Sequence, residues 1–466
     1  MNPPATIWEK ISPWNLRYLF YMVSPNETIY ENHDDMPDYY GLVTFWFLVL
    51  VVVESCCNCK RVSFSDSITS IVAGISSMLF KIRGRSLSVF LYPIVYSAIH
   101  VVSLPLSTST WIIAFLTQDL AYYLGHRAIH EFGVFWGFHQ MHHSSEFYNL
   151  STALRQGAIQ DMGMCIFDLL QAFFVPPEIF YPHKTLNVLY QFWIHTEKVP
   201  SLGFLEYVIN TPSSHRVHHG RNPYAIDRNY GATLIIWDIL FGTYAAERKE
   251  EQVVYGLVHP SRTFNQWRLQ VDVFIHFLAV KMWDKDEEGK ELFPGVWNKL
   301  KTVFQPPGYY PGTRTRWFFF WTCMEDSEEG IPVIPDSEAA RDQAYAPKLT
   351  LACKGYILVQ FLFLLKSYLD FNETRPALEW GEFLLRMTII LFTIQSFGYF
   401  FDKQRCAVPI DLVRLSFIAF VGVLQGNLVM VYISVASAAF LLLIHFTGQL
   451  PELNDEDRGL AHAHSE

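Results

Sequence analysis

Two short stretches of the chain, HQMHH at His139–His143 and HRVHH at His215–His219, each place three histidines within five residues. In an α-helix, residues at positions i, i+3 and i+4 lie on one face, so each stretch is expected to direct its imidazoles toward one point. A third stretch, HRAIH, repeats the i, i+4 spacing at His126 and His130. Metal sites of the H-E-x-x-H type use this spacing. The three stretches therefore predict helices that present histidines to metal, in preference to histidines stacked on a surface.

The region of these stretches holds most of the histidines of the chain. Ten of the seventeen lie between residues 126 and 219, and all of these except His183 are candidate metal ligands. A catalytic zinc takes about three protein ligands and a structural zinc four, so nine imidazoles exceed what one ion needs. Two ions with four or five ligands each fit the number better. The predicted metal ligands are His126, His130, His139, His142, His143, His195, His215, His218 and His219.

The composition is that of a membrane protein: 51% of the residues are hydrophobic and only 17% are charged. The apolar run Tyr39–Cys57 is long enough to cross a hydrocarbon core of about 30 Å as a helix, and it starts too far from Met1 to be a cleaved signal peptide. The net charge of −10 and the absence of a long basic block argue against nucleic acid as a partner. We therefore expect an integral membrane protein.

Charges beside the first apolar run set the orientation. Acidic residues precede it and Lys60 and Arg61 follow it, so the positive-inside rule places the N-terminus in the lumen and residue 60 in the cytosol. Val89–Leu106 and Trp111–Leu124 are expected to form an out-and-back hairpin, which returns the first histidine stretch to the cytosolic side. Met162–Ile194 is interrupted by prolines and is expected to dip into the membrane and return.

This orientation divides the chain into segments. The aromatic run RWFFFW at Arg316–Trp321 favours an interfacial anchor over a cofactor site, and the C-terminal spans carry no motif that indicates chemistry. The expected segments are a lumenal N-terminus (1–38), transmembrane and re-entrant helices (39–125), a catalytic region (126–260) with a membrane hairpin (162–194), a cytosolic connection (261–348), C-terminal transmembrane helices (349–446) and a cytosolic tail (447–466).

Imidazole alone does not identify the metal, because it suits iron, zinc and copper alike. Nitrogen-only ligation of a redox pair at the cytosolic mouth of an apolar helix bundle indicates oxidation of a lipid chain, and we infer two iron ions. The predicted fold is thus an all-α polytopic membrane protein, in which a transmembrane helix bundle bears a histidine-rich diiron helical cap on its cytosolic side. Metal-bound imidazoles donate their second N–H to a carboxylate or a carbonyl. Nearby carboxylates that could receive it are Asp119, Glu131, Glu146, Glu197, Asp227 and Asp238.

The pattern H-x3-H, H-x2-HH, H-x2-HH, with eight residues between the first two stretches, resembles the membrane-bound fatty acid hydroxylase and sterol desaturase superfamily. The surrounding sequences HQMHHSSEFYNLSTALRQ, NTPSSHRVHHGRNPYAIDRNYGATLIIWDILFGTY and VVYGLVHP resemble its ether-lipid-cleaving branch. The resemblance is dense over roughly Asp119–Pro260. One departure is Ser214, which stands where a histidine is expected just before the third stretch, and it concerns only an auxiliary ligand.

The resemblance implies a multi-pass, nonhaem diiron enzyme of the endoplasmic reticulum membrane whose active site faces the cytosol and uses dioxygen and tetrahydrobiopterin. Its substrate would be a membrane lipid, an alkylglycerol or ether lysophospholipid, which is hydroxylated to a hemiacetal that collapses to a fatty aldehyde and a glycerol derivative. In the family, the glutamate after the second histidine of the first stretch is associated with the pterin, so Glu131 is the expected catalytic and pterin-binding residue. A homo-oligomer is left open.

Four arginines among the histidines have two possible roles. They could hold a headgroup phosphate or the pterin, or they could pair with the nearby carboxylates, as we expect for at least two of them. The four are Arg127, Arg155, Arg216 and Arg221.

Two other functions fit part of the pattern. A sterol or fatty acid/sphingolipid C-hydroxylase or desaturase, fed by a b-type cytochrome, shares the fold and the metals, and only the sequence around the histidines argues against it. A zinc transporter would place its ligands at the bilayer midplane on discontinuous helices, whereas these histidines lie at helix ends and in the cytosolic stretch. Because the chain lacks a G-x-G-x-x-G fingerprint, its electrons are expected from a diffusible reductant or a partner.

Overall fold

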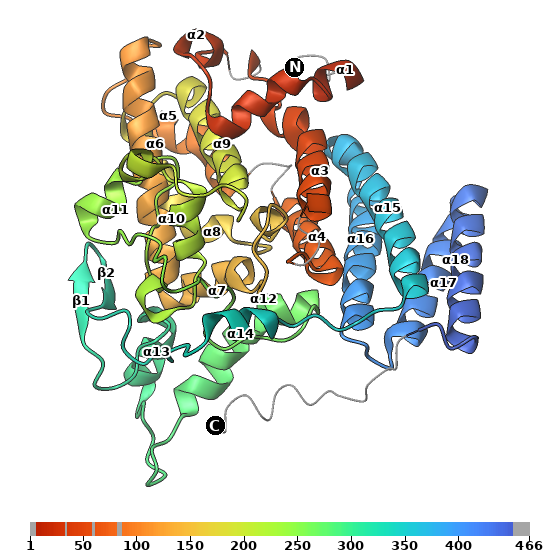
Figure 1. Cartoon of the computed structure of the whole chain (residues 1–466). Coiled ribbons are helices and arrows are strands. Elements are labelled where there is room, and N and C mark those ends of the chain that lie inside the picture. The colour runs from red at the N-terminus through yellow and green to blue at the C-terminus, as the bar shows by residue number, and fades with distance from the viewer. Residues whose placement is uncertain (1–5, 33–34, 58–60, 82–85, 451–466) are drawn as a thin grey trace.

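Nearly all of the secondary structure is helical (Figure 1). The computed structural model describes residues 6–32, 35–57, 61–81 and 86–450. In this described part, five helices are long and apolar enough to cross a membrane. The predicted all-α polytopic fold is therefore confirmed. The five are Tyr39–Cys57 (α3), Leu351–Ala377 (α15, Leu351–Thr374, with the turn after it), Trp380–Phe401 (α16), Ala407–Leu424 (α17) and Leu428–Phe446 (α18).

The other helices, most of them shorter, include those that carry the histidines, on the left of Figure 1, while α15–α18 lie on the right. Helix α6 is central to this half and contacts α7, α8 and α9. The helices are α1 (Ile7–Lys10), α2 (Pro25–Thr28), α4 (Phe64–Phe80), α5 (Leu87–Ile99), α6 (Thr108–Glu131), α7 (Gly133–His143), α8 (Asp161–Leu169), α9 (Pro177–Ile194), α10 (Pro212–His218), α11 (Ile236–Phe241), α12 (Gln266–Ile275), α13 (Val296–Phe304) and α14 (Ser337–Asp342).

Helix α6 carries the first histidine pair in its last two turns. It begins at Ser107, whose hydroxyl accepts a hydrogen bond from the Thr110 N–H, and it continues for 24 residues, through the expected segment boundary after residue 125. Helix α7 follows after one residue. A Cβ at Gly133 would lie 2.7 Å from the Val303 carbonyl oxygen, so only glycine permits this close approach. The tight connection brings the histidines of α7 beside those of α6.

The proline-interrupted segment folds as two helices, α8 and α9, and α9 starts with Pro177 at its first position. Helix α5 has 13 residues, fewer than the roughly 20 needed to cross a bilayer. Neither hairpin, α5–α6 or α8–α9, contains one of the five candidate spans. Their depth in the membrane therefore stays a prediction. Lys60 and residues 451–466 of the predicted tail lie outside the described residues.

One β-hairpin interrupts the helical pattern. Strand β1 (Thr315–Phe318) pairs antiparallel with β2 (Trp321–Met324), and Phe318 faces Trp321 across the pair. Phe319 and Phe320 therefore form a two-residue turn. The aromatic run predicted as an interfacial anchor is this hairpin, which packs near the end of α6.

The C-terminal helices α15–α18 enclose a polar cluster within an otherwise apolar core. Arg414 donates to Asp411 (2.6 Å) and to the Gln360 side-chain oxygen (2.8 Å), and the Gln360 amide donates to the Ser437 hydroxyl (2.9 Å). The Tyr356 hydroxyl also donates to Asp411. We refer to these five residues as the Asp411 cluster, which links α15, α17 and α18.

Candidate metal centre

The structure brings all nine predicted histidines together, in two groups. Within each group the ring nitrogens that could hold a metal lie within 4.8 Å of one another, and every member is buried. Five and four imidazoles are the division that two ions would need. The five-histidine group is His126, His130, His139, His143 and His218, and the four-histidine group is His142, His195, His215 and His219.

The expectation that each stretch points at one place is wrong. In α7, His139 and His143 belong to the five-histidine group and His142 to the four-histidine group. In α10 and the residue that caps it, His215 and His219 belong to the four-histidine group and His218 to the five-histidine group. An α-helix turns about 100° per residue, so positions i and i+4 differ by roughly 40°, whereas position i+3 lies roughly 60° away from i on the other side. Both helices thus contribute to both groups. The α7 stretch gives two histidines to the five-histidine group and one to the four-histidine group, and the α10 stretch gives one and two.

Backbone carbonyls fix the orientation of four of the imidazoles. The Nδ1 atoms of His126 and His218 lie 2.9 Å from the carbonyl oxygens of Tyr230 and Arg228. Asp227 and Asn229 have φ values of 56° and 57°, a left-handed conformation that Asp and Asn adopt more readily than most residues. Because these two left-handed residues each precede one of the carbonyl-bearing residues, the carbonyls of Arg228 and Tyr230 both point toward the histidines. The Nδ1 atoms of His142 and His195 similarly contact the carbonyl oxygens of Arg155 (3.0 Å) and Gln191 (2.6 Å).

The resulting arrangement of lone pairs fits metal ions. A neutral imidazole has one N–H, and where Nδ1 donates it to a carbonyl, Nε2 keeps a lone pair. Nε2 of His195 lies 3.2 Å from Nε2 of His142 and 3.1 Å from Nε2 of both His215 and His219. Since His142 and His195 both direct lone pairs into this space, a cation is the partner that satisfies them together.

The protonation state of the imidazoles agrees with metal ligation. Burial lowers the pKa of all nine, that of His142 to about 4, so they are neutral at pH 7. In addition, the buried Nε2 atoms of His130 and His218 have no hydrogen-bond partner in the described part of the chain. Buried polar atoms are rarely left so. The donor set and these unpartnered atoms therefore fit two metal ions.

Asp119 and Asp238, predicted as possible partners of the imidazoles, contact the backbone of a neighbouring loop instead. Asp119 accepts the backbone N–H groups of Thr233 (2.8 Å) and Leu234 (3.1 Å), and Asp238 accepts those of Tyr230 (2.8 Å) and Gly231 (2.7 Å). They hold the loop whose carbonyls orient the imidazoles. Glu197 instead pairs with Arg341 and Tyr255. Asp227 comes nearest to the prediction, with Oδ1 3.7 Å from Nδ1 of His130.

Glu131, Arg127 and Trp321 form a separate polar cluster next to His130 of the five-histidine group, which we call the Glu131 corner. Arg127 Nε lies 3.0 and 3.1 Å from the two carboxylate oxygens of Glu131, and the indole N–H of Trp321 donates to Oε2 at 2.8 Å. Phe318 stacks on the Arg127 guanidinium at 3.6 Å. Burial raises the pKa of Glu131, and the Arg127 charge opposes that shift. The sequence did not indicate Trp321, because it lies 190 residues beyond Glu131 and has no periodic spacing to the histidines.

Three of the four arginines pair with carboxylates, but only Arg127 pairs with one of the six carboxylates named from the sequence, Glu131. Besides Arg127, Arg216 pairs with Glu247 (2.7 Å) and Arg155 with Asp66 (2.9 Å). The fourth, Arg221, has a buried Nε that makes no hydrogen bond within the described residues.

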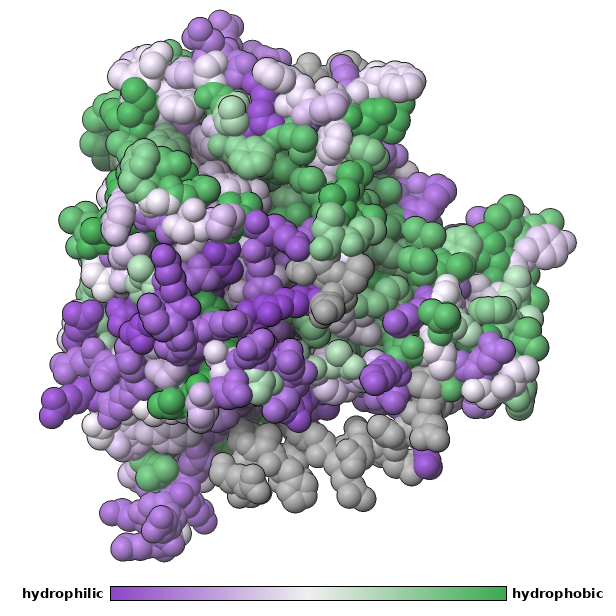
Figure 2. Space-filling view, viewed as in Figure 1, coloured by the Kyte–Doolittle hydropathy of each residue, from purple (hydrophilic) through white to green (hydrophobic). Residues whose placement is uncertain are grey.

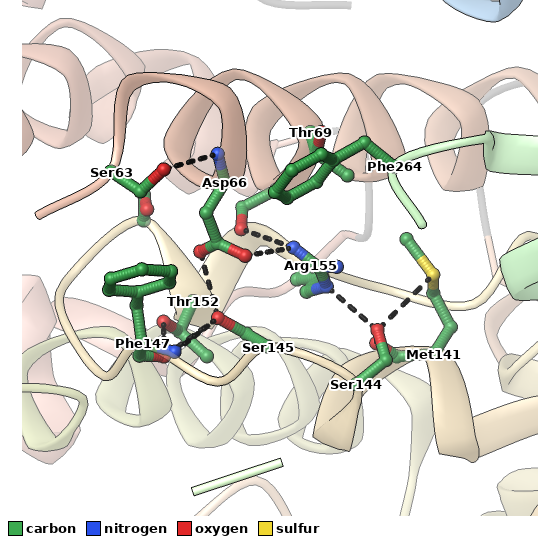
Figure 3. Close-up of polar contacts among 12 residues, drawn as sticks. Ser63, Asp66, Thr69, Met141, Ser144, Ser145, Phe147, Thr152, Arg155 and Phe264 are labelled. Atoms are coloured by element: carbon green, nitrogen blue, oxygen red, sulfur yellow. Dashed lines mark hydrogen bonds and ion pairs between the residues drawn. The ribbon is translucent and has the colours of Figure 1, made fainter. Parts of the chain in front are cut away.

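The Arg155 pair joins α4 to the loop after α7 (Figure 3). Arg155 Nε donates to the Ser144 hydroxyl (2.9 Å), and the Ser145 hydroxyl donates to Asp66 (2.8 Å). The Arg155 carbonyl is the group that receives His142. Through Arg155, helix α4 therefore helps to position a histidine of the four-histidine group.

Comparison with known proteins matches the same region of the chain, the one that carries the nine histidines. The family model described as Fatty acid hydroxylase matches residues 111–243, which include all nine histidines. The chain is 44% identical over 412 residues to an alkylglycerol monooxygenase of Caenorhabditis elegans, covering 87% of this chain and 81% of the relative. It is 38% identical over 421 residues to the alkylglycerol monooxygenase of Homo sapiens (89% and 88% covered) and 38% identical over 404 residues to that of Xenopus tropicalis (86% and 85%). No solved structure matches the chain.

Proposed function

The chain belongs to the alkylglycerol monooxygenase family, and from that premise we propose that it is a tetrahydrobiopterin-dependent diiron enzyme that cleaves the ether bond of alkylglycerols and alkyl lysophospholipids. The resemblance seen in the sequence is confirmed, and the protein is a lipid monooxygenase of the membrane. The observation that carries the proposal is the pair of buried, neutral histidine groups whose lone pairs converge.

The proposed reaction starts at the carbon that bears the ether oxygen. One oxygen atom of dioxygen enters a C–H bond there, the other leaves as water, and two electrons and two protons complete the balance. The resulting hemiacetal loses its alkoxy group, which takes the hydroxyl proton, to give a fatty aldehyde and the glycerol derivative. Bound iron would supply the activation of dioxygen, and the pterin would supply the two electrons.

The residues of the chain would divide the remaining tasks. We assign the nine histidines as the iron ligands, four of which are oriented by the carbonyls of Tyr230, Arg228, Arg155 and Gln191. We assign Glu131 to the pterin, as the family resemblance implies. Its carboxylate is already fixed by Arg127 and Trp321, so it can orient a polar ring without reorganising. The apolar helices would receive the alkyl tail.

The proposed location is the endoplasmic reticulum membrane, with the histidines on the cytosolic side. With the five candidate spans as its crossings, the chain would have the end of α3 and the start of α15 on one side of the bilayer. Figure 1 is consistent with this, since both ends lie toward the lower side of their helices. Arg61, directly after α3, is exposed there, as the positive-inside rule requires of a cytosolic end.

The test is an assay of membranes that contain the protein, with a 1-O-alkylglycerol as substrate and fatty aldehyde as readout. We expect aldehyde with tetrahydrobiopterin and none with NADH alone, and loss of aldehyde in His143→Ala. His100→Ala is the matched control, because His100 is exposed and belongs to neither group.

Aldehyde formed with NADH through a cytochrome donor would contradict the pterin assignment. No aldehyde with either reductant, in a protein that binds two irons, would favour the second candidate, a C-hydroxylase or desaturase that acts on sterols, fatty acids or sphingolipids. The histidine arrangement fits both candidates, and the relatives favour ether cleavage.

A further inference from the structure

The β1–β2 hairpin has two opposite faces. Trp321 is 2% exposed and donates to Glu131, and Phe318 packs on Arg127. On the other side, Trp317, Phe319 and Phe320 are 75%, 65% and 61% exposed. A single short hairpin thus has one end of its aromatic run fixed to the Glu131 corner and three large apolar side chains directed outward.

The turn of this hairpin is unusual in its chemistry. Two-residue β-turns favour Asn-Gly or Asp-Gly, because these residues adopt positive φ without strain. Here the turn is Phe319–Phe320, and Phe319 has φ of 53°. A bulky residue in this conformation is an outlier. Local backbone preference therefore does not explain the two phenylalanines, and an apolar environment around the tip would.

The apolar tip continues onto neighbouring helices. Phe320 lies beside Phe167 of α8 (ring centroids 5.9 Å apart) and Phe319 beside Phe241 of α11 (6.4 Å). These helices and the turn after α8 also carry exposed apolar side chains: Ile166 on α8, Leu170 directly after it, and Ile239 and Leu240 on α11.

Charge and position favour a lipid surface as the partner of this face. Arg316 is exposed next to Trp317 in β1, and Arg314 is exposed directly before the strand, at the base of the hairpin. Arginines near Trp and Phe are typical of segments at the headgroup level of a bilayer. Figure 1 shows the hairpin level with the lower ends of α15 and α16, two candidate spans. On the left edge of Figure 2, the hydrophobic surface gives way to hydrophilic surface at this height.

We propose that the β1–β2 hairpin is seated in the lipid surface through Trp317, Phe319 and Phe320, with Arg314 and Arg316 directed to lipid phosphates. The hairpin is then an interfacial anchor outside the five candidate spans. Its inner face presents Trp321 to the Glu131 carboxylate. The lipid contact is independent of the proposed reaction, so it stands or falls separately from the ether-cleaving function.

The test measures lipid contact directly in the full-length protein. A fluorophore is attached at Phe320→Cys in nanodiscs of phosphatidylcholine and phosphatidylserine, with or without brominated acyl chains, in a background where Cys56, Cys57 and Cys59 are serine. The control position is Trp297→Cys, because Trp297 is a large aromatic residue, 81% exposed on α13, and α13 lies below the strands of the hairpin in Figure 1. A thermal midpoint equal to that of the unlabelled parent checks that each labelled protein is folded, whatever reaction the protein performs.

We expect brominated lipid to quench the label at 320 at least three times more strongly than the label at 297. Arg314→Gln with Arg316→Gln should reduce that quenching in anionic nanodiscs and leave it unchanged in neutral ones. Equal quenching at 320 and 297 in a folded protein would overturn the proposal. So would a label at 320 that is quenched by a water-soluble quencher as freely as the label at 297, since the tip would then face solvent or a soluble partner.

Discussion

The histidine centre and the Asp411 cluster are both buried polar groups in a largely apolar protein, yet they differ in how their atoms are satisfied. In the Asp411 cluster the Arg414 guanidinium donates to the Asp411 carboxylate, and the Gln360 amide donates to the Ser437 hydroxyl. In the histidine centre, the Nε2 atoms of His130 and His218 are buried without a hydrogen bond to any described residue. Buried polar networks that satisfy themselves stabilise a fold, whereas unpartnered atoms indicate a missing ligand. The comparison assigns structure to the first and chemistry to the second.

The largest expected effect follows from removing one histidine of the four-histidine group. In His195→Ala the group keeps three imidazoles, and aldehyde formation should fall by more than the roughly 100-fold typical of losing an outer partner of a metal ligand. Activity and iron per chain are measured together. His183→Asn is the matched control, because His183 is a buried histidine of the same helix, α9, outside both groups. Equal losses in both variants would show that α9 is only sensitive to packing.

The second prediction concerns the Asp411 cluster, where stability should change without chemistry. Arg414→Met leaves Asp411 buried without its cation, and breaking a buried pair costs about 3–5 kcal/mol. The thermal midpoint of the purified protein should drop, while iron content and turnover per folded molecule stay at the parent level. Lys366→Met is the control, since the Lys366–Asp370 pair is exposed and such pairs contribute about 0–1 kcal/mol. Loss of iron in Arg414→Met would mean that the cluster supports the site as well.

The same contrast shows what the sequence could predict. Eight of the nine histidines follow from helical spacing, which is a local property, whereas His195 has no partner at that spacing. The five candidate spans follow from apolar runs. The division of each stretch between two groups does not, because it depends on how α7 and α10 face each other. The partners of the imidazoles were predicted as carboxylates or carbonyls, and the carbonyls of Arg228 and Tyr230 depend on the φ values of Asp227 and Asn229, which no spacing reveals. The Asp411 cluster was likewise missed, because its partners come from different helices.

A third prediction tests whether α4 belongs functionally to the histidine centre. In Arg155→Met the ties to Asp66 and Ser144 are lost, so the carbonyl that receives His142 is no longer held. We expect metal affinity to fall by about 10- to 100-fold, the usual cost of disturbing an outer partner, and excess iron should restore part of the activity. Arg268→Met, which removes a partly exposed pair, is the control. An unchanged iron affinity in a less stable Arg155→Met would place this pair with the Asp411 cluster as a structural feature.

The smallest expected effect concerns Trp321, whose indole N–H holds one oxygen of Glu131. Trp321→Phe keeps an aromatic ring and removes only this donor, which should cost about 1–1.4 kcal/mol, or roughly 5- to 10-fold in kcat/KM. Because Glu131 is assigned to the pterin, the loss should appear in the KM for tetrahydrobiopterin and leave the KM for the lipid unchanged. Trp317→Phe, on the exposed face of the hairpin, should not change the pterin KM. If Trp321→Phe alters only the lipid KM, the Glu131 corner serves the substrate and not the reductant.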